Sequence, residues 1–226
     1  MTPADAVLFD FGGTLDADGV HWSPRFYTAY RAAGGSLDRP SFDVLFTRSD
    51  RALARLPGIR EFGFRDTVTW QARLLLEFVP DGRRIDPNRV AETFHTEARR
   101  AVERNRPVLA RLATRYRLGV VSNFSGNLDP CLRELGLTGL FQVVSDSTLV
   151  GATKPDSRIF TESLAALGVS ADRAWMVGDN FEADIQPATQ LGMRTCWITA
   201  PERGAPAGEA PTARIARLPD VERIVS

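Results

Sequence analysis

Lysine is almost missing from this sequence of 226 residues. Of the 28 basic residues, Lys154 is the one lysine and the rest are arginine, so any mechanism that needs a second lysine is excluded. Cysteine is scarce as well. Cys131 and Cys196 lie on different predicted elements, and neither has a histidine or cysteine at the spacing of a metal site. Two cysteines do not make a disulfide framework, so we expect a reducing, cytoplasmic location.

The sequence also lacks an excess of either charge and any long apolar run. Its 28 basic and 28 acidic residues cancel, which argues against nucleic acid or an anionic membrane surface as the main partner. No apolar run reaches membrane-spanning length, and the N-terminus lacks the basic and apolar regions of a signal peptide. A hydrophobic content of 43% is ordinary for a globular chain. The length allows one large domain, or a core domain with an insertion.

A short apolar run near the N-terminus ends in Asp10 and is followed by a Gly12-Gly13-Thr14 turn. Such a run bounded by glycines predicts a buried strand. Asp10 would then lie at the carboxyl end of that strand, where open α/β sheets bind their ligands. The N–H of Gly13 and the hydroxyl of Thr14 could contact an anion there. A carboxylate beside a bound anion is repelled by it unless a cation lies between them or the carboxylate attacks the anion. The alternative interpretation is that Asp10 caps a helix.

The order of predicted elements indicates an α/β fold. Residues 16–105 contain helical patterns without a convincing strand, at 23–33, 42–56, 65–78 and 87–103. Beyond them strands and helices alternate, with strands at 118–121, 141–144, 174–177, 195–198 and near Ile215, and helices at 108–116, 128–135, 156–167 and 182–191. Together with a first strand at 6–11, this alternation predicts a parallel, Rossmann-like sheet covered by helices. We therefore expect a core domain of residues 1–15 and 106–226 and an inserted helical cap domain of residues 16–105.

Polar residues follow the predicted strands at the edge where such a sheet binds its ligand. They are Asp10, Ser122 with Asn123, Lys154 before a helix, and Asp179 with Asp184. Carboxylate oxygens suit Mg²⁺, which takes one or two from protein beside waters and phosphate oxygens. An ammonium and a hydroxyl suit the remaining phosphate oxygens. With Mg²⁺ screening the repulsion, Asp10 could attack phosphorus.

These segments, in order, resemble the four motifs of the haloacid dehalogenase-like hydrolase superfamily. The matching motifs are Asp10-Phe11-Gly12-Gly13-Thr14-Leu15, Ser122-Asn123, Lys154-Pro155 and Gly178-Asp179 with Asp184. The resemblance spans essentially the whole chain. It implies a Rossmann-like core whose helical cap, inserted after the first motif, closes over the substrate.

The resemblance also implies a role for each motif residue. Asp10 would be the nucleophile and a Mg²⁺ ligand, the backbone carbonyl of Gly12 a second ligand and Asp179 a third, with Asp184 in or near the metal shell. The transferring phosphoryl group would be held by Ser122, Asn123 and Lys154.

One position departs from the phosphatases and mutases of this superfamily, which usually carry an acid–base aspartate two residues after the nucleophile. Here that position is Gly12. A positioned acid–base contributes about 10²–10⁴-fold, so its absence predicts a slow phosphatase or different chemistry. Asp16, Asp18 and His21 are candidates to replace it, against the plainer alternative of solvated linker residues. Acyl or aryl phosphates would need no acid.

Two other branches of the superfamily tolerate a small residue at this position. Its dehalogenases lack the aspartate but work without metal, whereas Gly178-Asp179 with Asp184 resembles the metal-binding version. Its phosphonoacetaldehyde hydrolases use Mg²⁺ but need a cap lysine, and residues 16–105 contain none.

These observations predict a Mg²⁺-dependent hydrolase, most simply a phosphatase acting on a small phosphorylated metabolite through an aspartyl phosphate on Asp10. The alternatives are a weak or degenerate member that binds a phosphorylated ligand or a partner, and a hydrolase with non-phosphatase chemistry. Cap arginines could meet a second anionic group on the substrate or be solvated: Arg48, Arg51, Arg60 and Arg65. His95 is expected to be structural. We expect a monomer or homodimer that binds neither nucleic acid nor membrane.

Overall fold

The structure, a computed structural model, describes residues 4–225 except 201, 203 and 205–209. In this part of the chain one parallel sheet has the strand order β3-β2-β1-β4-β5-β6. The strands are β1 (Ala6–Phe9), β2 (Arg117–Ser122), β3 (Val143–Asp146), β4 (Ala174–Gly178), β5 (Arg194–Ile198) and β6 (Ala213–Ile215). The parallel α/β fold predicted from the alternating pattern is confirmed.

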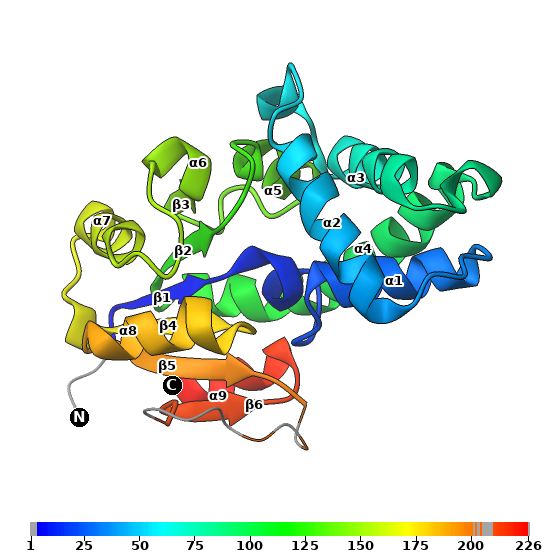
Figure 1. Cartoon of the computed structure of the whole chain (residues 1–226). Helices are drawn as coiled ribbons and strands as arrows, with labels where there is room; N and C mark the ends of the chain where they lie inside the picture. The colour runs from blue at the N-terminus through cyan, green and yellow to red at the C-terminus, as the bar shows by residue number, and fades with distance from the viewer. Residues whose placement is uncertain (1–3, 201, 203, 205–209, 226) are drawn as a thin grey trace.

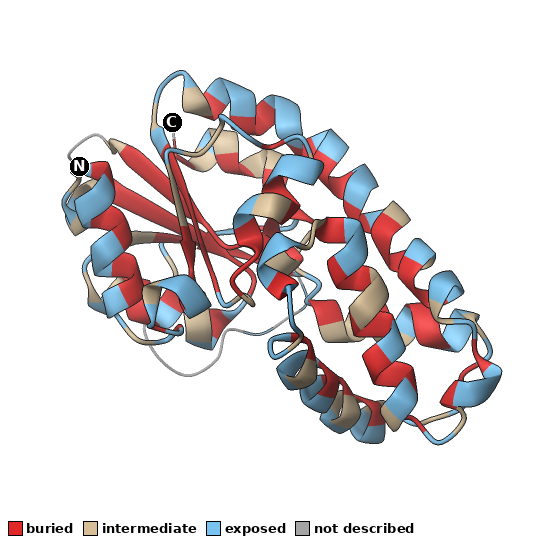
Figure 2. Cartoon of the chain, turned by 90° about the horizontal axis from the view of Figure 1, so that it is seen from above, coloured by how far each residue is buried: buried red, intermediate tan, exposed pale blue. Residues whose placement is uncertain are grey.

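Both faces of the sheet are covered, because alternate residues of each strand point to opposite sides. Val7 and Phe9 of β1 pack in one cluster with α5 (Leu128–Glu134), α9 (Glu222–Val225) and the end of α4. Leu8 faces the other way and packs with α7 (Arg158–Leu167) and α8 (Gln186–Gln190). Figure 2 shows the strands coloured mostly as buried between helices whose outer faces are exposed. A sheet buried on both faces explains the near-continuous apolar runs of its strands.

The segment between β1 and β2 is helical. It forms α1 (Trp22–Ala32), α2 (Arg39–Leu53), α3 (Phe64–Phe78) and α4 (Pro87–Ala113). Asp38 and Asp86 cap α2 and α4, each followed within two residues by a proline in the first turn, which is the favoured chemistry of a helix start. Figure 1 shows the strands pointing toward the side of the molecule where α1, α2 and α3 lie.

The helix α4 differs from the sequence-based prediction, which ended one helix at 103 and began another at 108. Its 27 residues run continuously through Pro107. Asn105, buried in its middle, donates from Nδ2 to the carbonyl of Leu15 at 3.1 Å, which fastens α4 to the turn after β1. The helix α4 is continuous across the expected border between residues 105 and 106, so no break in the chain marks a domain boundary there. The division into a core of 1–15 and 106–226 and a cap of 16–105 stays a prediction.

Two shorter elements also differ from the prediction. The helix expected at 182–191 is a wide helical turn (Phe181–Ile185) continued by α8, and a short helix, α6 (Ser147–Val150), follows β3 unpredicted. Among the described residues, no helix is both long enough and apolar enough to cross a membrane.

Candidate active site

The site forms where the order of strands reverses. The strand β1 lies between β2 and β4, so the connections leaving its two neighbours run to opposite sides and open a crevice at the carboxyl ends. Asp10 follows β1 directly, and its backbone N–H donates to the carbonyl of Val177 in β4 at 2.9 Å. Asp179 follows β4 in the same way. Two carboxylates distant in sequence are therefore set side by side by the sheet.

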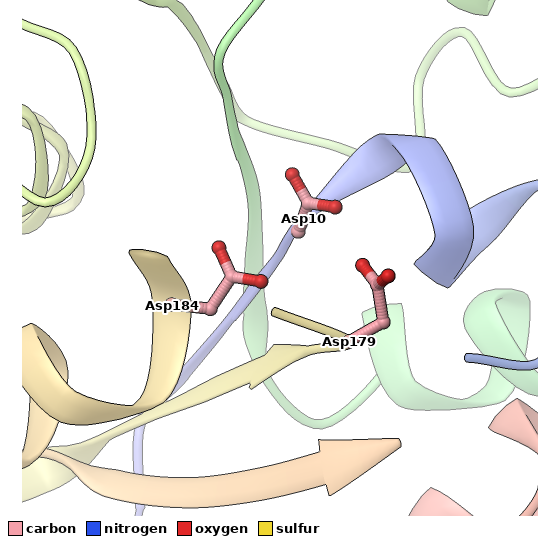
Figure 3. Close-up of side chains that lie close together, drawn as sticks. All are labelled: Asp10, Asp179 and Asp184. Atoms are coloured by element: carbon pink, nitrogen blue, oxygen red, sulfur yellow. The ribbon is translucent and has the colours of Figure 1, made fainter. Parts of the chain in front are cut away.

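Three carboxylates gather at this point. One oxygen each from Asp10, Asp179 and Asp184 lies within 4.8 Å of the others, and all three side chains are buried. Figure 3 shows them converging from the end of β1, the end of β4 and the helical turn that follows β4. Such a cluster is unstable unless cations compensate it, because like charges repel strongly away from water.

The Lys154 ammonium supplies part of that compensation. Its Nζ donates to Asp10 Oδ1 at 2.7 Å, to Asp184 Oδ1 at 2.6 Å and to the carbonyl of Val121 at 2.9 Å. Burial alone would lower the pKa of Lys154, but the two carboxylates outweigh burial and raise it. The one lysine of the chain is thus a buried, charged member of the site.

A divalent cation fits the remaining charge. When all three carboxylates are ionised, one ammonium leaves two of their negative charges uncompensated. Burial, together with Asp10 and Asp184, raises the pKa of Asp179. Burial also raises the pKa of Asp184 to about 6, against the opposing effect of Lys154. Clustered carboxylate oxygens are the donors that Mg²⁺ prefers, and Gly12, whose carbonyl was the expected further ligand, lines the same cavity.

Ser122 and Asn123, at the end of β2, lie beside this cluster. The hydroxyl of Ser122 donates to Asp10 Oδ1 at 3.1 Å. The side-chain amide of Asn123 pairs with the backbone of Lys154: its Nδ2 donates to the carbonyl at 3.0 Å and its Oδ1 accepts from the N–H at 2.8 Å. Asn123 therefore fixes the loop that carries Lys154, a role that the sequence did not indicate.

Gly13 and Thr14 lie against Asp179. The hydroxyl of Thr14 donates to Asp179 Oδ1 at 3.4 Å, and the N–H of Gly13 donates to Asp16 Oδ1 at 2.7 Å. Gly13 has a φ of 97°, and a Cβ there would lie 2.5 Å from Asp179 Oδ2, so only glycine fits. Neither residue is among those that line the cavity, and their contact with substrate stays a prediction.

A cavity of about 420 Å³ opens above the cluster, between the sheet and the inserted helices. Its lining from the sheet side includes Asp10, Gly12, Ser122, Asn123, Phe124, Lys154, Asp179 and Asp184. Its lining from residues 16–105 consists of His21, Trp22, Phe46, Asp50, Arg51, Leu53, Ala54 and Thr67. The predicted site residues are thus brought together in one hollow, apart from Gly13 and Thr14 just beneath it.

The three candidates for the missing acid–base fall in different places. Asp16 is fully buried and accepts hydrogen bonds from the backbone, an indole and a guanidinium. Asp18 forms an ion pair with Arg104 at 2.7 Å. Both aspartates line a hollow that is separate from the cavity above the carboxylate cluster. His21 lines the cavity, with its Nδ1 3.8 Å from Asp179 Oδ2. Of the three, His21 alone can reach a bound substrate.

The sequence analysis missed several cavity residues, among them Asp50 and Phe46, both on α2. Asp50 is exposed as a residue, but partial desolvation of its carboxyl raises its pKa, against the charges of His21 and Arg51. Their spacing with Leu53 places all of them on one face of α2, but nothing in the sequence says that this face meets the cavity.

Among the four cap arginines considered, Arg51 lines the cavity. Arg48 lies over the ring of Phe78, and Arg65 pairs with Glu92 at 2.7 Å. His95 is buried in α4 and is not part of the lining.

Comparison with known proteins agrees with this geometry. Residues 4–192 match a family model described as haloacid dehalogenase-like hydrolase. Among curated proteins, pyrimidine 5'-nucleotidase YjjG of Escherichia coli is 34% identical over 111 residues, which are 48% of this chain and 49% of that protein. Glyceraldehyde 3-phosphate phosphatase of Methanothermobacter thermautotrophicus is 43% identical over 86 residues, 38% of each chain. The chain spans less than half the length of such curated relatives.

Solved structures match over nearly the whole chain. The L-2-haloacid dehalogenase RSc1362 superposes with a TM-score of 0.67 at 25% identity, covering 99% of each chain. The hydrolase YfnB of Bacillus subtilis, bound to magnesium, superposes with a TM-score of 0.59 at 19% identity, again covering 99% of each chain. The second likeness concerns the fold alone.

Proposed function

Because the chain belongs to the haloacid dehalogenase-like hydrolase family, we propose that it is a Mg²⁺-dependent phosphatase of a small phosphorylated metabolite. Curated relatives named as phosphatases and a nucleotidase support this substrate class. The observation that carries the proposal is the buried cluster of Asp10, Asp179 and Asp184 with Lys154 as its partner. Its two uncompensated negative charges suit a divalent cation.

In this mechanism Asp10 is the nucleophile. One of its carboxylate oxygens bonds to phosphorus while the bond from phosphorus to the leaving oxygen breaks, and the leaving oxygen keeps the electron pair. Water then attacks phosphorus of the aspartyl phosphate, which releases inorganic phosphate and restores Asp10. Ser122 and Lys154 both hydrogen-bond Asp10 Oδ1, so they orient the other oxygen, Oδ2, for attack. A bound Mg²⁺ would neutralise charge on the phosphoryl oxygens, held by Asp10, Asp179, Asp184 and the Gly12 carbonyl.

Dehalogenation is the second candidate function. The observation that favours it is Gly12, because it leaves the site without the acid–base usual in the phosphatases, and RSc1362 is named a dehalogenase. Asp10 would then attack a carbon instead of phosphorus. The cluster of Asp10, Asp179 and Asp184 weighs against this alternative, because three clustered carboxylates suit a divalent cation.

The two functions separate in one assay. We would measure phosphate release from a panel of phosphorylated metabolites and an aryl phosphate, and chloride release from 2-chloropropionate, each with Mg²⁺ and with EDTA. The proposal expects phosphate release that needs Mg²⁺ and is lost in Asp10→Asn. Halide release that survives EDTA would replace it with dehalogenation. Gel filtration of the same protein would test the proposed monomer or homodimer.

A further inference from the structure

The indole of Trp22 crowds the space in which a side chain at Gly12 would begin. A Cβ at this position would lie 3.0 Å from Nε1 and 3.1 Å from Cδ1 of Trp22. The backbone itself would accept a side chain, because its φ of −77° and ψ of 110° lie in a region open to any residue. Position 12 is therefore restricted by the indole of Trp22 and not by its conformation.

Trp22 is held in place by a buried carboxylate. Its Nε1 donates to Asp16 Oδ2 at 2.9 Å. The same oxygen accepts from Arg25 at 2.8 Å, and Oδ1 accepts from the N–H of Gly13 at 2.7 Å. Asp16 is fully buried. Moving the indole would take one hydrogen-bond donor from this buried carboxylate, which is unfavourable.

Aromatic rings fix the indole from the other sides. Their centroids lie 5.0 to 6.5 Å from that of Trp22 and belong to Phe11, Phe26, Phe64, Phe94 and Phe124. Trp22 is itself 7% exposed, and that small exposed part lines the cavity. A close-packed side chain of this size has no second place to go.

The apolar part of this wall, around Trp22, offers no free proton donor. The one N–H of the indole is used by Asp16, and Phe46, Leu53 and Ala54 beside it in the cavity are apolar. His21 and Asp50 also line the cavity, but no hydrogen bond within the described part of the chain fixes either side chain, and His21 is 57% exposed. An effective acid has to be positioned within hydrogen-bond reach of the leaving oxygen.

We propose that Trp22, held by Asp16, occupies the space in which an acid–base side chain at position 12 would lie. The site is therefore selective for phosphorylated compounds whose leaving group departs without being protonated. Chemically these are phosphate esters of acidic hydroxyl groups and mixed anhydrides of phosphoric and carboxylic acids. This inference rests on the proposed phosphatase function and names its substrate class.

The step balances without an acid. The Oδ2–phosphorus bond forms at Asp10, the bond from phosphorus to the leaving oxygen breaks, and the electron pair leaves with that oxygen as a phenolate, enolate or carboxylate. A water oxygen later bonds to phosphorus while the bond from phosphorus to Asp10 Oδ2 breaks, and its electron pair returns to Oδ2. The protons of that water go to the released phosphate or to solvent. An alkoxide is too basic to leave in this way, so alkyl phosphates react slowly.

The test is the dependence of rate on the leaving group. We would measure kcat/KM with Mg²⁺ for substituted phenyl phosphates, from 4-nitrophenyl to unsubstituted phenyl, and for a simple alkyl phosphate and acetyl phosphate. We expect a steep fall along the phenyl series and a loss of at least about 100-fold from 4-nitrophenyl to alkyl phosphate. Rates nearly independent of the leaving group would overturn the inference but leave the phosphatase function standing. If Asp10→Asn matches wild type on every substrate, the proposed function falls and the inference with it.

Variants locate the cause of the dependence of kcat/KM on the leaving group, which we call the slope. Gly12→Asp alone should not flatten it, whereas Gly12→Asp combined with Trp22→Ala should, because the double variant opens the space for the carboxylate. Trp70→Ala, a tryptophan of α3 outside the cavity lining, is the control and should keep the wild-type slope. A shallow slope that becomes steep in His21→Ala or Asp50→Asn would identify that residue as the acid and overturn the inference. The wild-type slope decides even if a variant fails to fold.

Discussion

The two walls of the cavity are built differently. On the sheet side the buried Lys154 donates hydrogen bonds to Asp10 and to Asp184, which are buried as well. On the helical side His21 and Asp50 face the cavity with no hydrogen bond to fix their side chains within the described residues. Trp22 and Thr67 differ from these two, because Asp16 accepts from the indole and Asn127 donates to the Thr67 hydroxyl. This difference leads us to expect that the sheet side carries the reaction and that the inserted helices select the substrate.

The largest effect should follow from removing the nucleophile. Asp10→Asn should lower phosphatase turnover by roughly 10⁴-fold or more, because an amide does not attack phosphorus. Steady-state phosphate release measures it. The matched control is Asp156→Asn, an aspartate paired with Arg158 at the surface, which should keep full turnover. Full turnover in Asp10→Asn would mean that the sheet wall does not carry the chemistry.

Breaking the charge pairing of the sheet wall should cost stability as well as activity. Lys154→Met leaves the buried carboxylates of Asp10 and Asp184 without their ammonium, so we expect the free energy of unfolding to fall by about 3–5 kcal/mol. Urea unfolding without added Mg²⁺ measures it. Adding Asp184→Asn should recover part of the loss. A Lys154→Met protein as stable as wild type would contradict the pairing.

Removing one metal ligand should weaken both Mg²⁺ binding and turnover without unfolding the protein. Asp179→Asn should lower activity by roughly 10²–10³-fold, the usual cost of losing one electrostatic contact to the reacting group. Mg²⁺ affinity, measured by isothermal titration calorimetry, should weaken in parallel. Glu182→Gln, an exposed carboxylate three residues on, is the control and should bind Mg²⁺ as wild type does. Unchanged Mg²⁺ binding in Asp179→Asn would contradict the assignment of Asp179 as a metal ligand.

The smallest expected effect is on stability, at the contact between Gly12 on the sheet side and Trp22 on the helical side. Gly12→Ala should lower the free energy of unfolding by about 1–3 kcal/mol, because its methyl group overpacks against Trp22. Gly204→Ala, where a Cβ would meet nothing within 4 Å, should change stability little. Thermal unfolding compares the two. Equal stability would show that the indole yields easily and that position 12 is open to an acid.

The sheet wall was predictable from sequence and the helical wall was not. Strands and turns are local patterns, and the carboxyl ends of parallel strands meet at one edge, so Asp10 and Asp179 could be paired although far apart in the chain. The roles of Trp22 and Asp50 depend on how the inserted helices pack on that edge, which periodicity does not specify. Trp22 reads in the sequence as one more core aromatic; its fit against Gly12 needs the three-dimensional structure.

The orientation of single polar groups was likewise beyond the sequence. Asn123 stands beside the expected phosphate contact Ser122, yet its amide is used by the backbone of Lys154. Asp16 follows the first motif closely enough to be a candidate acid, yet it is fully buried under Trp22 and Arg25. Hydrogen-bond partners are chosen by tertiary geometry, so sequence distance from a motif does not decide them.

The most direct test of the central claim is to look for the phosphoryl group on Asp10. The protein would be mixed with Mg²⁺ and excess acetyl phosphate or 4-nitrophenyl phosphate, quenched in acid within one turnover, and analysed by peptide mass spectrometry. We expect one added phosphoryl group on the peptide that contains Asp10. It should be absent with EDTA and absent in Asp10→Asn. Substrate turnover with no phosphoryl group on that peptide, or with one on another residue, would contradict it.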